Sequence, residues 1–255
     1  LTYKIDLYHD RDREFTYSNG QRNGEFLNKS NIFSLSLGQQ LKRLGKVFIT
    51  AQIKSSNLSS ISGTGYPTGR LDLRTLSMQS TIDTQNEYPF PTSGKMFSFS
   101  YEIASAEESG KNLTFFKLRS SLETFIPFRK RNTINPKISW GTSDITTPFS
   151  EQFKIGGLNS LYGLNENEFR GRHFIVSSIQ YRYLMPSKLD IDFYWGFRYD
   201  VGAAWVNAED IKPKDLNNGM GISLAFDTFL GPITIAHGWH ESGKETTYFS
   251  IGYDF

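Results

Sequence analysis

Residues 191–205 read IDFYWGFRYDVGAAW, and apolar and polar residues alternate along most of this stretch. Its odd positions up to 203 hold Ile, Phe, Trp, Phe, Tyr, Val and Ala, while its even positions hold Asp, Tyr, Gly, Arg, Asp, Gly and Ala. Because every second side chain of a β-strand points to the same face, the pattern predicts a strand with one apolar and one mostly polar face. Such a strand is longer than the usual strand of about 5–6 residues in a globular sheet.

The same alternation recurs along the chain, in twelve segments separated by turn signals. A strand that crosses a membrane needs roughly 9–11 residues, and several segments are at least that long. The alternation is less regular in 71–84 and 132–144. The twelve segments are residues 1–8, 31–41, 45–56, 71–84, 95–106, 115–128, 132–144, 172–184, 190–205, 217–229, 232–240 and 246–255.

The connections between these segments differ in length on the two sides of the predicted sheet. Counted from the first, the odd-numbered connections are long and most even-numbered ones are short, with 85–94 as the exception. Outer-membrane barrels show this asymmetry, with short periplasmic turns and longer outer loops. An even strand number would also place both ends of the barrel on the periplasmic side. The long connections are 9–30, 57–70, 107–114, 145–171, 206–216 and 241–245, and the short ones are 42–44, 129–131, 185–189 and 230–231.

The composition narrows the class of protein. The 255 residues are 15% aromatic, contain no cysteine and carry a formal net charge of +2. The absence of cysteine excludes disulfides and cysteine-bound metals, and the small net charge gives no support for nucleic-acid binding. No run approaches the roughly 18 apolar residues of a membrane helix. A mildly negative mean hydropathy is compatible with a membrane barrel, because alternate residues of its strands face a polar lumen.

We therefore expect an all-β fold, a transmembrane antiparallel up-and-down β-barrel of about twelve strands, formed by residues 1–255 as a single domain. Its apolar face would contact outer-membrane lipids. The alternative is a soluble β-sandwich binding module, which would turn its apolar faces inward.

The predicted inner faces carry charges of both signs. Such a mixture favours a paired network, which would stiffen the barrel, and not a selective pore. These charged residues are Lys117, Arg119, Glu123, Arg182, Arg198, Asp200 and Asp227.

The last segment carries the pattern of an assembly signal. Phe249, Ile251, Tyr253 and Phe255 alternate along it, and the chain ends in the last of these aromatic residues. An edge strand with an apolar outer face is a template for strand addition. The pattern resembles the C-terminal β-signal of outer-membrane proteins, which implies the barrel assembly machinery as a partner during biogenesis. The alternative is an ordinary edge strand.

The most specific local motif is residues 153–164, FKIGGLNSLYGL, followed by FRG at 169–171. It resembles the GG-containing loop of the BamA–TpsB superfamily of outer-membrane barrels. In that family the loop folds back into the lumen and five strands normally follow it, and five predicted strands follow it here. The resemblance implies a lumen loop built on Phe153, Gly156, Gly157, Tyr162, Gly163, Arg170 and Gly171.

Two further stretches support the same resemblance. Residues 197–205, FRYDVGAAW, are similar to the family's aspartate–glycine–tryptophan strand, which implies that Asp200, Gly202 and Trp205 contact the loop. Residues 231–235 and 249–255 resemble its last two strands. The family barrel usually has sixteen strands, so either four strands precede Leu1 or the barrel is smaller. Because the chain begins with leucine, we expect it to be the C-terminal part of a longer polypeptide.

One departure from the family pattern indicates which branch of the superfamily the chain resembles. BamA-like members carry Arg-Gly-Phe at the loop tip, and that arginine pairs with acidic groups in the lumen. The matching residues here are Tyr162, Gly163 and Leu164, so the arginine is absent. The motif is more similar to the patatin-like branch, in which the barrel follows a periplasmic patatin-like phospholipase domain and a POTRA domain (type Vd secretion).

This resemblance implies a barrel that anchors an N-terminal periplasmic or passenger domain in the bacterial outer membrane, and that helps to translocate or position it. The first alternative is an insertase or secretion pore of the same superfamily, acting through a weak seam between segments 1–8 and 246–255. Whether the chain forms a homodimer stays open. No nucleic-acid partner is expected.

Motifs for bond chemistry are absent from the sequence. There is no G-x-S-x-G, no P-loop and no dinucleotide-binding fingerprint, so we expect no catalytic residue, no cofactor and no enzyme activity in this domain. His237 and His240 lie three residues apart on a predicted strand and would face opposite sides, so no metal site is expected. Arg170 and Arg172 flank Gly171 and would either pair with lumen acids such as Asp200 or Asp227 or be solvated.

Overall fold

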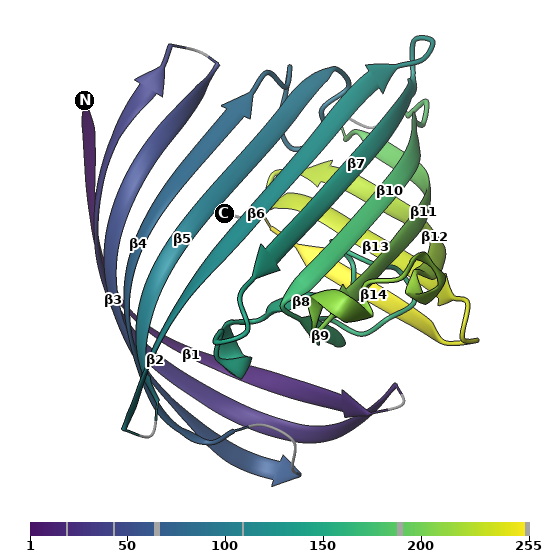
Figure 1. Ribbon diagram of the computed structural model, residues 1–255. Coiled ribbons are helices and arrows are strands. Elements are labelled where there is room, and N and C mark those ends of the chain that lie inside the picture. Colours follow the sequence, from purple (N-terminus) through teal and green to yellow (C-terminus); the bar gives the residue numbers. More distant parts are fainter. Residues whose placement is uncertain (19, 43, 64–66, 109, 188–190, 253–255) are drawn as a thin grey trace.

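The computed structural model describes residues 1–18, 20–42, 44–63, 67–108, 110–187 and 191–252. Twelve strands form one antiparallel sheet in which neighbours follow each other in chain order (Figure 1). Two short strands, β8 (Phe153–Ile155) and β9 (Phe169–Gly171), pair with each other. No helix in the described part of the chain is long and apolar enough to cross a membrane.

The remaining elements have the following bounds. The strands of the large sheet are β1 (Thr2–Ser18), β2 (Gln21–Leu41), β3 (Gly45–Gly63), β4 (Gly69–Asp83), β5 (Gly94–Glu108), β6 (Lys111–Pro127), β7 (Asn132–Ser143), β10 (His173–Leu184), β11 (Phe193–Trp205), β12 (Asn217–Thr228), β13 (Gly231–His240) and β14 (Glu245–Ile251). Single 3-10 turns are η1 (Phe149–Glu151), η2 (Ala208–Asp210) and η3 (Pro213–Asp215).

The sheet curls round on itself, and β7 pairs directly with β10 while residues 144–172 leave the sheet between them (Figure 1). The predicted all-β, up-and-down architecture is therefore confirmed, including the five strands after the loop. The fold is a single curved sheet and not the pair of packed sheets of the sandwich alternative. In the described residues the ladder runs from β1 to β14, and no strand pairing joins these two ends.

Several strands continue past the ends that the alternation predicts. β1 and β2 remain paired as far as Ser18 and Gln21, and β5 and β6 as far as Glu108 and Lys111. β2 alone has 21 residues, roughly 70 Å at about 3.3 Å per residue, against roughly 30 Å of membrane hydrocarbon. Three predicted long connections are therefore wrong, since most of their residues are in strands: 9–30, 57–70 and 107–114.

The two faces of these long strands exchange polarity, which explains the misplaced ends. On β4, Leu76 and Met78 share the outer face and are 56% and 43% exposed, whereas Leu71 and Leu73 on the inner face are buried. The outer face continues beyond Leu76 with charged residues such as Arg74. A barrel strand turns apolar side chains outward in lipid, whereas a sheet in water buries them. This reversal is expected where strands pass from lipid into water.

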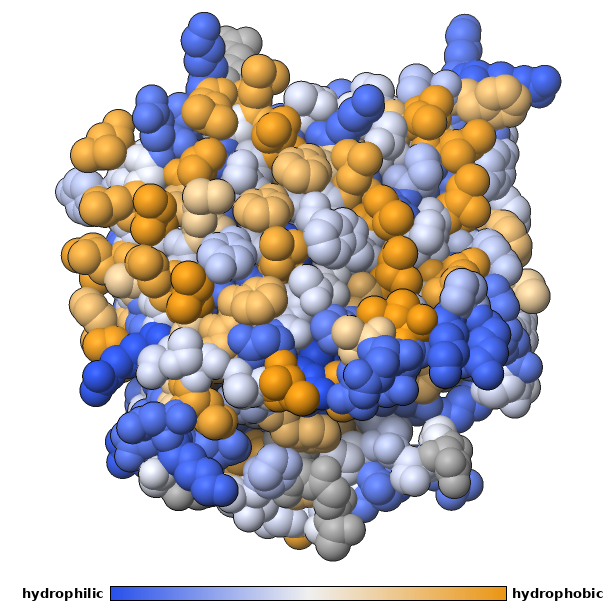
Figure 2. Space-filling view, viewed as in Figure 1, coloured by the Kyte–Doolittle hydropathy of each residue, from blue (hydrophilic) through white to orange (hydrophobic). Residues whose placement is uncertain are grey.

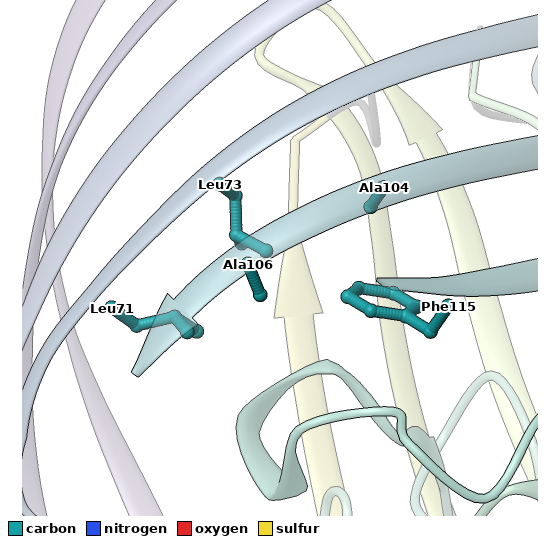
Figure 3. Packing of buried hydrophobic residues seen from close by; sticks show 5 residues of the cluster. All are labelled: Leu71, Leu73, Ala104, Ala106 and Phe115. Carbon is teal, nitrogen blue, oxygen red and sulfur yellow. The ribbon is translucent and has the colours of Figure 1, made fainter. Parts of the chain in front are cut away.

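We call the part of β1 to β6 that continues past the predicted strand ends the extension. Its inner side holds small apolar cores. Leu71, Leu73, Ala104, Ala106 and Phe115 come from β4, β5 and β6 and form one cluster (Figure 3). A second cluster joins β2 and β3 and packs against the loop between β7 and β10. It consists of Phe26, Leu58 and Phe149. The extension therefore folds over the mouth of the barrel and meets the loop there.

The outer face of the rest of the sheet is apolar. Hydrophobic side chains cover much of the middle of the face shown in Figure 2, and hydrophilic ones gather toward its upper and lower ends. Outward side chains on distant strands are exposed to similar degrees, for example Ile49, Ile179, Ile222 and Ile235. The matching inward positions are mostly small or polar, as the alternation predicts.

Candidate functional site

The connection from residue 144 to 172 lies inside the curve of the sheet, as the motif predicts. Its tip is fully enclosed, because Leu161, Tyr162 and Leu164 are at most 2% exposed. The chain turns at Gly156 and Gly157, whose φ angles of 120° and 95° suit glycine. The tip therefore behaves as part of the barrel core and not as a mobile surface loop.

A patch of glycines on the inner wall receives the loop tip. A Cβ added with ideal geometry at Gly219 would lie 2.4 Å from the carbonyl oxygen of Tyr162, and one at Gly238 would lie 2.5 Å from the backbone nitrogen of Gly163. A Cβ at Gly163 itself would lie 2.3 Å from the backbone nitrogen of His240. Loop and wall thus approach backbone to backbone, which only glycine allows.

Arg198 and Asp200 on β11 bind the loop tip from the other side. The Asp200 carboxylate is fully buried, and it accepts the Tyr162 backbone N–H at 3.0 Å and Arg198 Nε at 2.6 Å. The Arg198 guanidinium also donates to the carbonyls of Leu158 at 2.7 Å and Ser160 at 2.5 Å. Its carbon lies 4.3 Å from the centre of the Tyr162 ring. The cation that neutralises the buried carboxylate therefore comes from the strand.

The last two strands hold the part of the loop that follows the tip. Tyr248 Oη donates to the Leu164 carbonyl at 2.6 Å, and Thr246 Oγ1 donates to the Gly163 carbonyl at 3.1 Å. Lys244, in the turn between β13 and β14, forms an ion pair with the almost completely buried Glu168. These contacts fix the loop to the C-terminal end of the sheet.

The base of the loop is bound to the N-terminal end of the sheet. The buried Glu14 of β1 accepts Lys154 Nζ at 2.6 Å and an Arg170 guanidinium nitrogen at 3.1 Å. Arg170 is thus paired, but with Glu14 and not with the Asp200 or Asp227 expected for the flanking arginines. One loop therefore contacts both ends of the sheet, β1 and β14.

The start of the loop is bound to the wall through η1. Glu151 pairs with Lys54 of β3 at 3.0 Å and lies 3.8 Å from Lys117 of β6. Burial raises the pKa of Glu151, but the two lysines outweigh burial and hold it below its usual value. Arg172, the other flanking arginine, donates to the carbonyls of Val206 and Ile145 and has no lumen acid as its partner in the described residues.

The other predicted site residues fall in three places. Phe153 packs on Phe174 of β10, with ring centres 4.9 Å apart. A Cβ added at Gly171 would lie 2.5 Å from the Trp205 backbone. Phe153, Gly171 and Trp205 therefore lie where the loop meets the wall. Gly202 lies against Ile175 and Val176 of the neighbouring strand instead of the loop.

At the C-terminus, Phe249 and Ile251 point outward and are 66% and 54% exposed. Tyr253 and Phe255 lie outside the described residues, so the assembly signal stays a prediction. His237 and His240 lie on opposite faces of β13, since the first is partly exposed beside Thr247 and the second is buried beside Ser242.

Apart from Asp200, sequence reasoning missed the acidic partners of the loop. Glu14 lies within a predicted connection, and no role in binding the loop is predicted for Glu151 or Glu168. Arg198 was placed correctly in the lumen, but its role at the loop tip depends on how β11 and the loop meet. Only the alternation on β11, which puts Arg198 and Asp200 on one face, signalled that the two could act together.

Comparisons with known proteins give a family and a fold. A model described as the Omp85 superfamily domain matches residues 1–255. The solved structures that match include the crystal structure of BamA from Haemophilus ducreyi lacking POTRA domains 1-3, with a TM-score of 0.71 and 14% sequence identity. That match covers 89% of this chain and 55% of the BamA chain, so this chain spans about half of its length. No curated protein matches the chain.

Proposed function

The chain belongs to the Omp85 superfamily, and we propose that it is a bacterial outer-membrane barrel that anchors an N-terminal periplasmic or passenger domain and helps to position or translocate it. In this proposal the outward apolar side chains contact lipid. The barrel performs no bond chemistry, and any lipase activity belongs to the attached domain.

The observation that supports anchoring best is the occupied lumen. The loop between β7 and β10 is bound to β1 through Glu14, to β11 through Asp200 and to β14 through Tyr248. Buried ions that are paired and hydrogen-bonded resist rearrangement, because breaking one partner leaves the other uncompensated. A lumen filled in this way favours a stiff membrane anchor over an open channel.

The type of attached domain rests on the loop motif alone. The tip carries Tyr162 where BamA-like members carry arginine, and Arg198 supplies a cation to Asp200 from the strand. This arrangement is compatible with the patatin-like branch named by the resemblance. A G-x-S-x-G motif in the coding sequence upstream of Leu1 would support a patatin-like domain, whereas several POTRA repeats would support an insertase.

A second candidate is an insertase or secretion pore of the same superfamily. One observation favours it: in the described residues, β1 pairs on one side only, with β2. Backbone groups within hydrocarbon need partners, so the other edge of β1 would pair with a further strand. A strand entering between β1 and β14 would meet that need.

Anchoring is tested by fusing a soluble, folded reporter domain upstream of Leu1 and exporting the fusion in a Gram-negative host. We expect the reporter in the outer-membrane fraction, released by detergent and not by salt or carbonate. Protease added to intact cells then separates positioning in the periplasm from translocation to the surface. A reporter that stays in the soluble periplasmic fraction, as the unfused control does, would rule out anchoring.

A further inference from the structure

The connection between β4 and β5, residues 84–93, is a built loop that folds toward the lumen; we call it the strap. It is the even-numbered connection that the sequence pattern sets apart by its length. Asn86 holds its two arms together, because its Oδ1 accepts the backbone N–H groups of Thr92 at 3.0 Å and Ser93 at 2.9 Å. Its own backbone N–H donates to the Ser93 carbonyl at 3.2 Å.

The strap reaches across the inner face of the sheet. Its Phe90 ring lies 4.6 Å from the ring of Tyr194 on β11, and Pro91 is buried. The strands β6, β7 and β10 separate the strap's own β5 from β11 in the sheet order. Tyr194 is the second residue of β11 and is buried, so its contact with Phe90 requires the strap to turn into the lumen at that rim.

Arg182 on β10 holds the inner end of the strap. It is 8% exposed and donates to the Pro91 carbonyl. Its guanidinium carbon lies 5.6 Å from the Phe90 ring centre, 5.8 Å from that of Phe125 and 5.3 Å from that of Tyr194. In the described part of the chain its Nε has no hydrogen-bond partner, and no carboxylate forms an ion pair with it. A buried cation without a directly paired carboxylate is costly, so the Pro91 carbonyl and the Phe90 ring of the strap stabilise it, together with the Phe125 and Tyr194 rings of the wall.

The strap and the long loop enter the lumen from opposite ends. Strands alternate in direction, so the end of β4 and the end of β7 lie at opposite rims of the sheet. A cavity of about 420 Å³ separates the two segments. Its lining includes Phe90 and Pro91 of the strap and Leu158 and Tyr162 of the loop.

We infer that the strap is a second luminal plug, at the rim where β1 begins and β14 ends, and that Arg182 is the residue that positions it. The cavity is then a chamber between two plugs, and its access from that rim depends on the contact between Arg182 and the strap. This inference goes beyond the proposed function and applies equally to an anchor and to a pore.

The test uses a thiol in the chamber wall, because the chain has no cysteine of its own. Ala225 is 7% exposed, lines the cavity and is the cross-strand neighbour of Tyr194. The purified barrel carrying Ala225→Cys is treated in detergent with a charged methanethiosulfonate reagent, and the labelling rate is measured by mass. Ser62→Cys, in an exposed part of β3, reports the rate at an open site.

We expect Ala225→Cys to react slowly in the unsubstituted background and about tenfold faster or more with Arg182→Gln, since a lost charge-assisted hydrogen bond shifts such equilibria by that order. Asn86→Ala, which loosens the strap without touching Arg182, should also accelerate labelling. The matched control is Arg119→Gln, a luminal arginine that stacks on Phe174 and should leave the rate unchanged. Heat-modifiable migration verifies that each variant folds. If Arg182→Gln does not fold, the labelling rate measured with Asn86→Ala decides the test.

Hydrogen exchange gives an independent readout on the strap itself. Peptides covering residues 85–94 should exchange faster in Arg182→Gln than in Arg119→Gln, while peptides of β12 should not change. The inference is overturned if Ala225→Cys already reacts as fast as Ser62→Cys, or if neither Arg182→Gln nor Asn86→Ala changes its rate. None of these outcomes depends on whether an upstream domain is anchored.

Discussion

Replacing Arg198 by methionine should detach the loop tip from the barrel wall. The substitution keeps an unbranched apolar stem but removes the partner of Asp200, which is fully buried, and the donors to Leu158 and Ser160. Removing one member of a buried ion pair typically lowers the free energy of unfolding by about 3–5 kcal/mol. We expect a loss of that order, together with faster hydrogen exchange in residues 156–164.

The measurement is urea unfolding of the barrel in lipid vesicles, followed by tryptophan fluorescence. Asp200→Asn should cost less than Arg198→Met, because an amide oxygen still accepts the Tyr162 N–H. The double variant should be more stable than the sum of the two single effects predicts, since no uncompensated charge remains. Arg74→Met, at an exposed position, serves as control. If Arg198→Met unfolds at the same urea concentration as this control, with unchanged exchange at the loop tip, the assigned role of Arg198 is wrong.

Four further outcomes follow from the same contacts. Gly163→Ala should destabilise the barrel by about 1–3 kcal/mol, whereas Gly243→Ala should cost less, because both glycines have φ near 80° but only Gly163 is crowded by β13; equal losses in urea unfolding would refute the crowding argument. Glu14→Gln should increase hydrogen exchange of residues 153–171 without affecting β12, because Lys154 and Arg170 lose their carboxylate; protection equal to wild type would count against that contact. The pKa of Glu151 is held below its ordinary value of 4.5, so its stabilising effect should persist above that pH and disappear as the pH falls through the lowered value; Glu151→Gln should flatten this part of the stability–pH curve, and an unchanged curve would contradict the assignment. Deleting Phe255 should reduce the amount of barrel assembled in the outer membrane, measured as the heat-modifiable fraction, and assembly at the wild-type level would exclude the signal.

The strands were predictable because lipid and lumen impose opposite polarity on alternate residues. The same rule misplaced the outer ends of β1 to β6, where the chain continues as a sheet in water. Segment 71–84 alternated poorly for this reason: Leu71 and Leu73 face inward in the extension, whereas Leu76 and Met78 face outward. Backbone pairing does not change at this boundary, so side-chain polarity alone cannot locate the end of a strand.

The loop was predictable as a motif, and so were Asp200 and Trp205 as its partners on β11, but its other partners were not. The glycines of the motif indicate tight turns, and Tyr162 and Gly163 do lie at the buried tip. The partners of the whole loop come from β1, β11, β13 and β14, as much as 156 residues away in the pair of Arg170 with Glu14. Such pairs depend on the register and curvature of the whole sheet, which no local pattern encodes. The strap is similar, since its length was visible in the sequence but its inward direction was not.

The outward orientation of the apolar face is tested most directly with the chain's own tryptophans. Trp140, Trp195 and Trp239 lie on the outer face and are 42%, 37% and 39% exposed, whereas Trp205 is 9% exposed. Single-tryptophan variants, with the other three replaced by phenylalanine, are reconstituted in vesicles with brominated acyl chains. We expect strong quenching of the three outer tryptophans by these lipids, weak quenching by aqueous acrylamide, and little effect of either on Trp205. Quenching of the outer three by acrylamide but not by brominated lipid would contradict a barrel whose apolar face lies in the membrane.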